Sequence, residues 1–248
     1  MISYSKFAQF YDTLTKNISY IERAKYFDTI IEKFGGTRGI LLDLACGTGS
    51  LSEEFAKLGY DVIGVDNSEE MLNVALDKKF DSELPIQYLR QDMTKLDMFG
   101  TIDVTICALD SLNHLVNIEA IIKTIERVSL FAEPNGLFIF DVNTPYKHKN
   151  VLANNTFIYD TEDVYCIWQN SYYDKDNRVL INLDFFEKDK EVYYRSEESF
   201  SEVAYPKELL DEILTNAGFE VVAHYDFDTF NEPNETSEKI IFVARKVR

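Results

Sequence analysis

The sequence contains few cysteines and histidines. Three of each occur in 248 residues, and Cys46, Cys107 and Cys166 lie far apart along the chain. None of them forms a Cys-x-x-Cys pair or a Cys/His spacing typical of zinc sites. The pattern argues against a disulfide framework and against a metal site, and it fits a reducing compartment.

Basic residues are also few. Lysine and arginine number 25 against 43 aspartates and glutamates, which gives a formal net charge of −18, and no run of lysine or arginine is present. The field of such an acidic surface repels a polyanion. We therefore expect that nucleic acid is not a partner of this protein.

Long apolar runs are absent as well. No stretch approaches the roughly 18 apolar residues of a membrane-spanning helix, and no signal-like apolar segment follows Met1. We expect a cytoplasmic protein without a membrane partner, and nothing in the sequence indicates an oligomeric state. With 46% hydrophobic and 27% charged residues, the chain has material for a sizeable core. Its length suits one large domain or one domain with an insertion.

The most informative stretch covers residues 40–49. Apolar residues surround Asp43, a pattern typical of a strand that is buried on both faces. Gly47 and Gly49 then allow the backbone to take positive φ angles and to approach a ligand closely. A helix follows, with Ser50 as its expected N-cap. A strand, a glycine turn and a helix in this order are how α/β proteins build a nucleotide-binding crevice.

Strands and helices alternate over the first 145 residues. After an N-terminal segment that forms either a lid or a helix packed on the core, helical spacing predicts helices over 19–34 and 118–131, and two more after the glycine turn and after Ser68. Apolar runs predict buried strands over 61–66, 85–90, 102–109 and 137–142. Their order and continuous apolar character predict a largely parallel sheet with helices on both faces.

The pattern changes after Pro145. No helical period occurs between about 154 and 204, where β-rich runs cover 156–159, 164–173, 178–187 and 191–203. This piece carries 12 acidic against 5 basic residues and 11 aromatic residues. We predict that residues 146–204 form an inserted antiparallel β subdomain, with one face solvated and one packed, which covers the substrate.

The α/β pattern returns after the insertion. A helix begins near Pro206 and ends before Gly218, and apolar runs over 219–225 and 239–246 predict two last strands. Two strands in direct succession indicate a closing hairpin, with one strand antiparallel to the rest. We thus predict a doubly wound, seven-stranded, mostly parallel α/β fold, formed by residues 1–145 and 205–248.

The segment Asp43-Leu44-Ala45-Cys46-Gly47-Thr48-Gly49 resembles the first motif of class I S-adenosylmethionine-dependent methyltransferases. That motif is commonly Asp-x-Gly-x-Gly-x-Gly, so Ala45 replaces its first glycine. Asp66 stands at the end of the second strand, like the family's ribose-binding acid, and Asp92 follows the third, where a family acid usually contacts adenine. The resemblance covers 37–143 well and 205–246 by topology. It implies a Rossmann-like methyltransferase fold, S-adenosylmethionine as cofactor, and a small-molecule acceptor.

The resemblance also implies a set of cofactor-binding residues. The glycine turn lies against the methionine portion of the cofactor, and Asp43 balances its positive end. Asp66 accepts hydrogen bonds from the ribose diol, and Asp92 accepts from the adenine amino group between two methionines. In full, the predicted cofactor-binding residues are Tyr11, Asp43, Ala45, Cys46, Gly47, Thr48, Gly49, Asp66, Asn67, Met71, Gln91, Asp92, Met93, Leu109 and Asp110.

Methyl transfer from a sulfonium is an in-line displacement, so holding the acceptor atom in line supplies much of the acceleration. An amine or hydroxyl acceptor must also lose a proton, and we expect a nitrogen or oxygen acceptor rather than carbon. His114 is the candidate base, because an imidazole has an unperturbed pKa of ~6.5. Tyr11 is the second catalytic candidate, and we expect Tyr20 and His114 to contact the substrate.

Two alternatives remain open. An NAD(P)-dependent oxidoreductase needs the fingerprint Gly-x-Gly-x-x-Gly/Ala, and reading from Gly47 places Ser52 at its last position. A non-catalytic S-adenosylmethionine-binding protein would carry the same cofactor residues as the enzyme. Measuring whether the protein binds S-adenosylmethionine or NAD distinguishes a methyltransferase from the oxidoreductase. An assay of methyl transfer distinguishes the methyltransferase from the non-catalytic binding protein.

Overall fold

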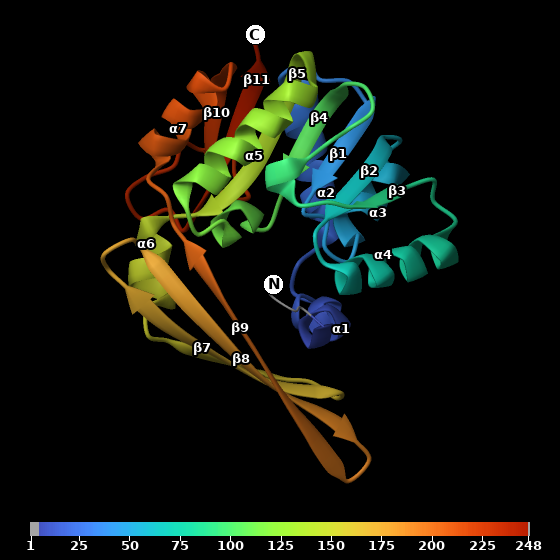
Figure 1. Ribbon diagram of the computed structural model, residues 1–248, viewed down its shortest axis with the longest axis vertical. Coiled ribbons are helices and arrows are strands. Elements are labelled where there is room, and N and C mark those ends of the chain that lie inside the picture. Colours follow the sequence, from blue (N-terminus) through green and yellow to red (C-terminus); the bar gives the residue numbers. More distant parts are fainter. Residues whose placement is uncertain (1–4, 248) are drawn as a thin grey trace.

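The computed structural model describes residues 5–247, with side chains from Phe7 onward, and contains two sheets (Figure 1). The larger sheet has seven strands in the order β10-β11-β5-β4-β1-β2-β3. Its strands are β1 (Ile40–Leu44), β2 (Asp61–Asp66), β3 (Gln87–Arg90), β4 (Ile102–Cys107), β5 (Ala132–Asn143), β10 (Phe219–Asp226) and β11 (Lys239–Lys246). Only β11 runs antiparallel to its neighbours. The predicted α/β fold with a closing hairpin is confirmed.

Helices cover both faces of this sheet, and each face has its own apolar core. On one face lie α5 (Ile118–Phe131) and α7 (Lys207–Asn216), and on the other α2 (Tyr20–Lys33) and α3 (Ser50–Lys57). The spacing of Ile121, Ile125 and Val128 places all three on the buried side of α5. α4 (Glu69–Ser82) lies beside β3 at the edge of the sheet. No helix within residues 5–247 is long and apolar enough to cross a membrane.

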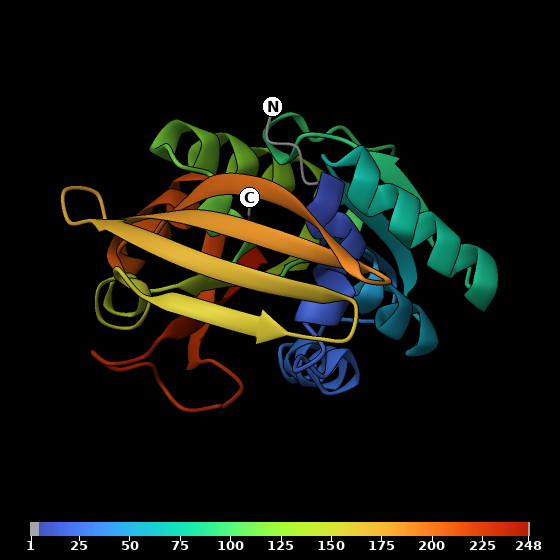
Figure 2. The same ribbon diagram turned by 90° about the horizontal axis from the view of Figure 1, so that it is seen from below.

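The second sheet is the insertion. After α6 (Pro145–Lys147) and the short helix η3 (His148–Leu152), the strands β6 (Thr156–Asp160), β7 (Val164–Tyr173), β8 (Arg178–Asp189) and β9 (Val192–Val203) pair in sequence order, all antiparallel. From Arg178 to Phe185 in β8, every second residue is buried, which confirms the prediction of one packed and one solvated face. Figure 2, which views the molecule from below, shows this inserted sheet in the foreground with the larger sheet behind it.

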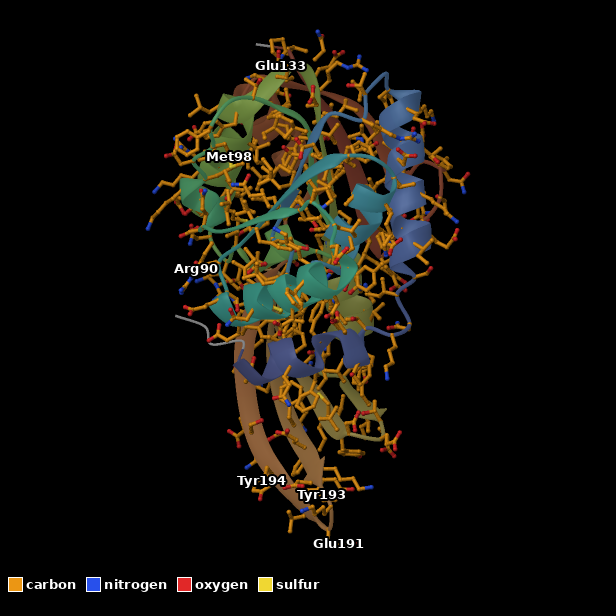
Figure 3. The ribbon with its side chains drawn as sticks, turned by 90° about the vertical axis from the view of Figure 1, so that its right-hand side faces the viewer. Arg90, Met98, Glu133, Glu191, Tyr193 and Tyr194 are labelled. Carbon is orange, nitrogen blue, oxygen red and sulfur yellow. The ribbon has the colours of Figure 1, made fainter. Side chains whose placement is uncertain are left out.

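The N-terminal helix α1 (Ser5–Leu14) lies between the inserted sheet and α4 (Figure 3). Its buried side chains Phe7 and Phe10 join the apolar cluster of the inserted sheet, where the Phe7 ring lies 6.4 Å from Phe185 and 6.1 Å from Phe200. Neither of them belongs to the two cores of the larger sheet. α1 therefore packs on the insertion, as a cover beside the carboxyl ends of β1 and β2.

Candidate active site

The glycine turn follows β1 at the carboxyl edge of the sheet. Ala45, Gly47 and Gly49 take φ angles of 62°, 54° and 76°. Gly49, rather than Ser50, is the N-cap residue of α3, and it makes no side-chain cap bond. The prediction that Ser50 caps this helix was therefore wrong, because the left-handed backbone at the cap position favours a glycine. Ser50 instead donates its hydroxyl to Asp12 of α1, over 3.2 Å.

The two glycines of the turn have different surroundings. A Cβ added to Gly49 would lie 2.2 Å from the Tyr88 hydroxyl oxygen, so this glycine is needed for packing. A Cβ added to Gly47 would meet nothing within 4 Å. The open side of Gly47 leaves room for a ligand to approach the backbone of the turn.

Ala45 takes a backbone conformation that disfavours a side chain. A left-handed φ costs an L-residue about 1 kcal/mol relative to glycine. We expect Ala45→Gly to raise the free energy of unfolding by roughly 0.5–1 kcal/mol, measured by urea denaturation. Ala120→Gly, in the first turn of α5, is the matched control and should lower it by a similar amount. If Ala45→Gly and Ala120→Gly lose equal amounts of unfolding free energy, the backbone at Ala45 is not strained.

Two acids lie beneath the turn. Asp43 is 2% exposed and accepts a hydrogen bond of 2.5 Å from the Ser52 hydroxyl. Burial, foremost, raises the pKa of Asp43 to about 7; the hydrogen bond from Ser52 opposes this shift, and the charge of Asp66 adds to it. Each carboxylate oxygen of Asp66 accepts a backbone amide, from Gly47 at 2.9 Å and from Ser68 at 2.8 Å. Burial raises the pKa of Asp66 as well, although these amide bonds act in the opposite direction.

A second tight turn follows β4. Leu109 and Asp110 both have positive φ angles, of 57° and 53°. Buried Asp141 accepts both of their backbone amides, at 2.7 Å and 3.0 Å, and so holds the turn. Lys239 Nζ lies 2.5 Å from Asp110 Oδ1 and 3.4 Å from Asp141 Oδ2. Burial alone would raise the pKa of Asp110, but the charges of Lys239 and Lys147 hold it well below its usual range. Asp110 is therefore an anion.

A small cavity connects these turns with α1. Its lining consists of Tyr11, Tyr20, Asp43, Ala45, Cys46, Gly47, Thr48, Ser50, Leu51, Ala108, Leu109 and Ser111. The structure thus brings together Tyr11 of α1, Tyr20 at the start of α2, the glycine turn and the tip of β4, which come from distant parts of the sequence. Burial, foremost, raises the pKa of the Cys46 thiol well above its ordinary value, so this side chain is neutral.

The residues predicted at the adenine end lie outside this cavity. Asp92 caps the short helix η1 (Met93–Lys95), because its Oδ1 accepts from the amide and the hydroxyl of Thr94 at 2.9 Å and 2.8 Å. The Gln91 side chain bonds the backbone of Asp97 in both directions. Asn67 is exposed, Met71 is buried against the cluster of α1, and Met93 packs on the core beneath α5.

The lid helix is tied to the glycine turn by a charged contact. Asp12 accepts from the Thr48 hydroxyl at 2.7 Å and pairs with Lys78 Nζ at 2.5 Å. Burial, followed by the charges of Tyr20 and Asp110, raises the pKa of Tyr11 well above its ordinary value. Tyr11 therefore stays a neutral phenol at physiological pH.

Several polar residues beside His114 were missed by reasoning from the sequence. His114 ends the short helix η2 (Ser111–His114), and its Nε2 lies 3.7 Å from Glu202 Oε1 of β9. The amide of Asn143 bridges Asp110 Oδ2 at 2.6 Å and Glu202 Oε2 at 3.2 Å. These residues carry no motif, and only the folded insertion brings Glu202 to the site. Within residues 5–247, no group of three or more His, Cys, Asp or Glu side chains is arranged to hold a metal ion.

Known proteins resemble this chain over its full length. Residues 41–136 match the family model described as a methyltransferase domain. The protein named "Putative methyltransferase YqeM" of Bacillus subtilis (strain 168) is 34% identical over 98% of this chain and 97% of its own. The chain belongs to the class I S-adenosylmethionine-dependent methyltransferases. A solved methyltransferase structure from Clostridium acetobutylicum ATCC 824, described as S-adenosylmethionine-dependent, superposes with a TM-score of 0.90 and 30% identity, over 99% of both chains.

Membership of this methyltransferase family decides between the alternatives. The chain is an enzyme, its cofactor is S-adenosylmethionine, and the NAD(P)-dependent and non-catalytic alternatives were wrong. A shorter match, to the glycine/sarcosine N-methyltransferase of Halorhodospira halochloris, is 32% identical over 53% of this chain and 51% of that protein.

The residues present fit this cofactor. The open side of Gly47 leaves the backbone of the turn accessible, and the cavity beside it is bordered by the neutral Cys46 and by Leu109. Asp66 stands at the end of β2, and its two oxygens are oriented by backbone amides. An extended ligand along this edge would meet the glycine turn first and Asp66 next.

Proposed function

We propose that this methyltransferase modifies a small molecule, at a nitrogen or oxygen atom that carries a proton. The observation that carries the proposal is that the cavity lies at the carboxyl edge of the larger sheet and is lined in part by Tyr11 of α1, the helix that packs on the inserted sheet. One apolar cluster holds α1 against the inserted sheet, and the Asp12–Lys78 pair holds it against α4, so a macromolecular acceptor would have to displace α1. The Halorhodospira relative, named for glycine and sarcosine, supports a small acceptor.

The cofactor residues of this proposal lie along the carboxyl edge of the sheet. The turn from Ala45 to Gly49 holds the methionine portion, Asp66 holds the ribose, and Asp92 accepts from the adenine amino group through the oxygen that does not cap η1. The bound cofactor supplies a methyl group activated on a sulfonium. The chain's own contribution is to position the acceptor and to keep water out.

The acceptor half of the site lies between Leu109 and the inserted sheet. Tyr11 and Tyr20 face the cavity and orient the acceptor as neutral phenols. His114 takes the acceptor's proton as the new bond to the methyl carbon forms and the carbon–sulfur bond breaks. The side chain of His114 is 30% exposed, so the proton has a route to solvent.

Methyl transfer with a labelled cofactor tests this proposal. The purified protein is incubated with methyl-labelled S-adenosylmethionine and, in separate reactions, with panels of small amines, small hydroxyl compounds, total RNA and unfolded protein. We expect label only in a small-molecule panel. Label in RNA or protein, with none in small molecules, would overturn the proposal.

Replacement of Asp66 tests the ribose assignment. We expect Asp66→Ala to weaken S-adenosylhomocysteine binding by roughly 1.5–3 kcal/mol, as for a lost hydrogen bond to a charged group. This equals about a 10- to 150-fold increase in Kd, measured by calorimetry. Asp61→Ala, at the exposed start of β2, is the control and should leave Kd unchanged. An unchanged Kd in Asp66→Ala would remove the assignment.

A further inference from the structure

Lys147 of α6 differs from the other lysines near the site in having no acidic partner. Lys78 Nζ lies 2.5 Å from Asp12, and Lys239 Nζ lies 2.5 Å from Asp110. In the part of the chain that the structure describes, no carboxylate lies at ion-pair distance from Lys147 Nζ, which donates a single hydrogen bond. An ammonium group has three N–H donors and no acceptor. Two donors of Lys147 are therefore open to a further partner.

The surroundings of Lys147 make its positive charge costly. Its side chain is half-buried, and removing an ammonium group from water disfavours the charged form. Burial, foremost, and the charge of Lys239 lower the pKa of Lys147, whereas the charges of Asp110, Glu202 and Glu238 oppose this shift from beyond ion-pair distance. An anion placed directly on the ammonium group would relieve this cost.

Asn143 separates Lys147 from the neighbouring acids. Asn143 Oδ1 accepts from Lys147 Nζ over 2.9 Å, so the amide nitrogen points the other way. That nitrogen donates to Asp110 Oδ2 at 2.6 Å and to Glu202 Oε2 at 3.2 Å. The other oxygen of Asp110 contacts Lys239, so both oxygens of this acid are engaged. The nearest acid of the turn is therefore not available to pair with Lys147.

The place of Lys147 in the fold is on the acceptor side of the site. Along the carboxyl edge of the larger sheet, β1 and β2 carry the glycine turn and Asp66, and β4 carries the turn at Leu109. The next strand on the far side of β4 is β5, which ends at Asn143. α6 follows at the junction of the two sheets (Figure 1). A group bound by Lys147 would thus lie one strand spacing, ~5 Å, beyond the turn that borders the cavity.

We propose that the methyl acceptor carries an anionic oxygen group, a carboxylate or a phosphate monoester, and that the ammonium group of Lys147 binds it. The inference rests on the proposed function and narrows its acceptor to a compact anion. Charge-assisted hydrogen bonds from the two open donors anchor one end of the acceptor, and its reacting atom lies at the turn of Leu109. The net charge of −18 repels anions from most of the surface, so such an acceptor needs a cation within the site.

Saturation-transfer NMR on the protein loaded with S-adenosylhomocysteine tests the proposal without requiring catalysis. The probes are small amines and hydroxy compounds in matched pairs, with carboxylates against their primary amides and phosphate monoesters against the free alcohols. We expect saturation transfer to anionic members only, and the two kinds of pair show whether carboxylate or phosphate is preferred. Equal signals from charged and neutral members, or no signal from any anionic member, would overturn the proposal.

Variants separate anion binding from simple support of the fold. Lys147→Met removes the charge with little change in volume and should raise the Kd of the preferred anionic probe about 10- to 100-fold. Lys147→Arg keeps a cation and should restore most of the binding. Lys149→Met, at an exposed pair with Asp174, is the control and should leave this Kd unchanged. All three should bind S-adenosylhomocysteine as wild type does. Unchanged probe binding in folded Lys147→Met would also overturn the proposal.

Methyl transfer to the same matched pairs distinguishes this inference from the proposed function. With the labelled cofactor, we expect label in anionic members, and Lys147→Met should raise KM for the acceptor more than it lowers kcat. Label in neutral small molecules alone would reject the role of Lys147 and keep the proposed function. Binding of an anionic probe that depends on Lys147, with no label in any small molecule, would reject the proposed function and keep the anion site.

Discussion

Replacing Asp43 with asparagine is expected to stabilise the free protein at pH 8 and to weaken its hold on the cofactor. The folded state raises the pKa of Asp43 to about 7, mainly by burial, from about 4 in an unfolded chain. The folded protein thus binds this proton more tightly, and stability falls as pH rises from about 4 to about 7. The asparagine of the variant has no charge to bury, and its carbonyl oxygen can still accept from Ser52.

The expected size of this effect follows from the pKa difference. About three units correspond to about 4 kcal/mol, and we expect Asp43→Asn to be more stable than wild type by about 2–4 kcal/mol at pH 8. Near pH 4 the difference should vanish, because the wild-type carboxyl is then protonated. Urea denaturation at both pH values measures it, with exposed Asp61→Asn as a control whose difference stays small.

The same variant is expected to lose affinity for the cofactor although it gains stability. The family resemblance implies that an anion at Asp43 balances the positive end of the cofactor, and on this expectation Asp43→Asn should bind S-adenosylmethionine about 10-fold less tightly. If Asp43→Asn is less stable than wild type at pH 8, or binds the cofactor as tightly as wild type, then Asp43 is not an acid that lowers stability in order to bind the cofactor. The combination is typical of residues kept for binding at the expense of stability.

The strands and their order could be predicted because the signal is local. Continuous apolar runs that end in an acid, as at Asp43 and Asp66, describe buried parallel strands whose polar ends meet at one edge. The same pattern occurs at Asp141, after the apolar run of β5, and it marks the acid that holds the turn at Leu109. That signal was present in the sequence, but its partner was 32 residues away and could not be assigned.

The residues around the expected acceptor position could not be predicted, for a different physical reason. The apolar stripe of α1 predicts a helix that packs on something, but the stripe does not say whether Phe7 and Phe10 meet the core or the insertion. Glu202 looked like any other acid of an acidic sheet, because burial of one side chain depends on the register of β9 against β8 and on where that sheet docks. Cofactor residues follow from one chain segment each, whereas the acceptor residues meet only after folding.

Removal of the Asp141 carboxylate is the second variant with a large expected effect. Asp141 accepts two backbone amides from residues with left-handed φ angles and faces Lys239, so Asp141→Ala leaves both amides without this acceptor in a buried place. We expect the free energy of unfolding to fall by about 3–5 kcal/mol, as when a buried ion pair loses one partner.

Two matched variants make the Asp141 result specific to this turn. Asp141→Asn keeps an oxygen for one amide and should lose less stability than Asp141→Ala, whereas Asp174→Ala, at an exposed pair with Lys149, should lose less than about 1 kcal/mol. Because the turn at Leu109 borders the cavity, Asp141→Ala should also weaken S-adenosylhomocysteine binding. If Asp141→Ala unfolds at the same urea concentration as wild type, the turn is held by its own packing and not by the carboxylate.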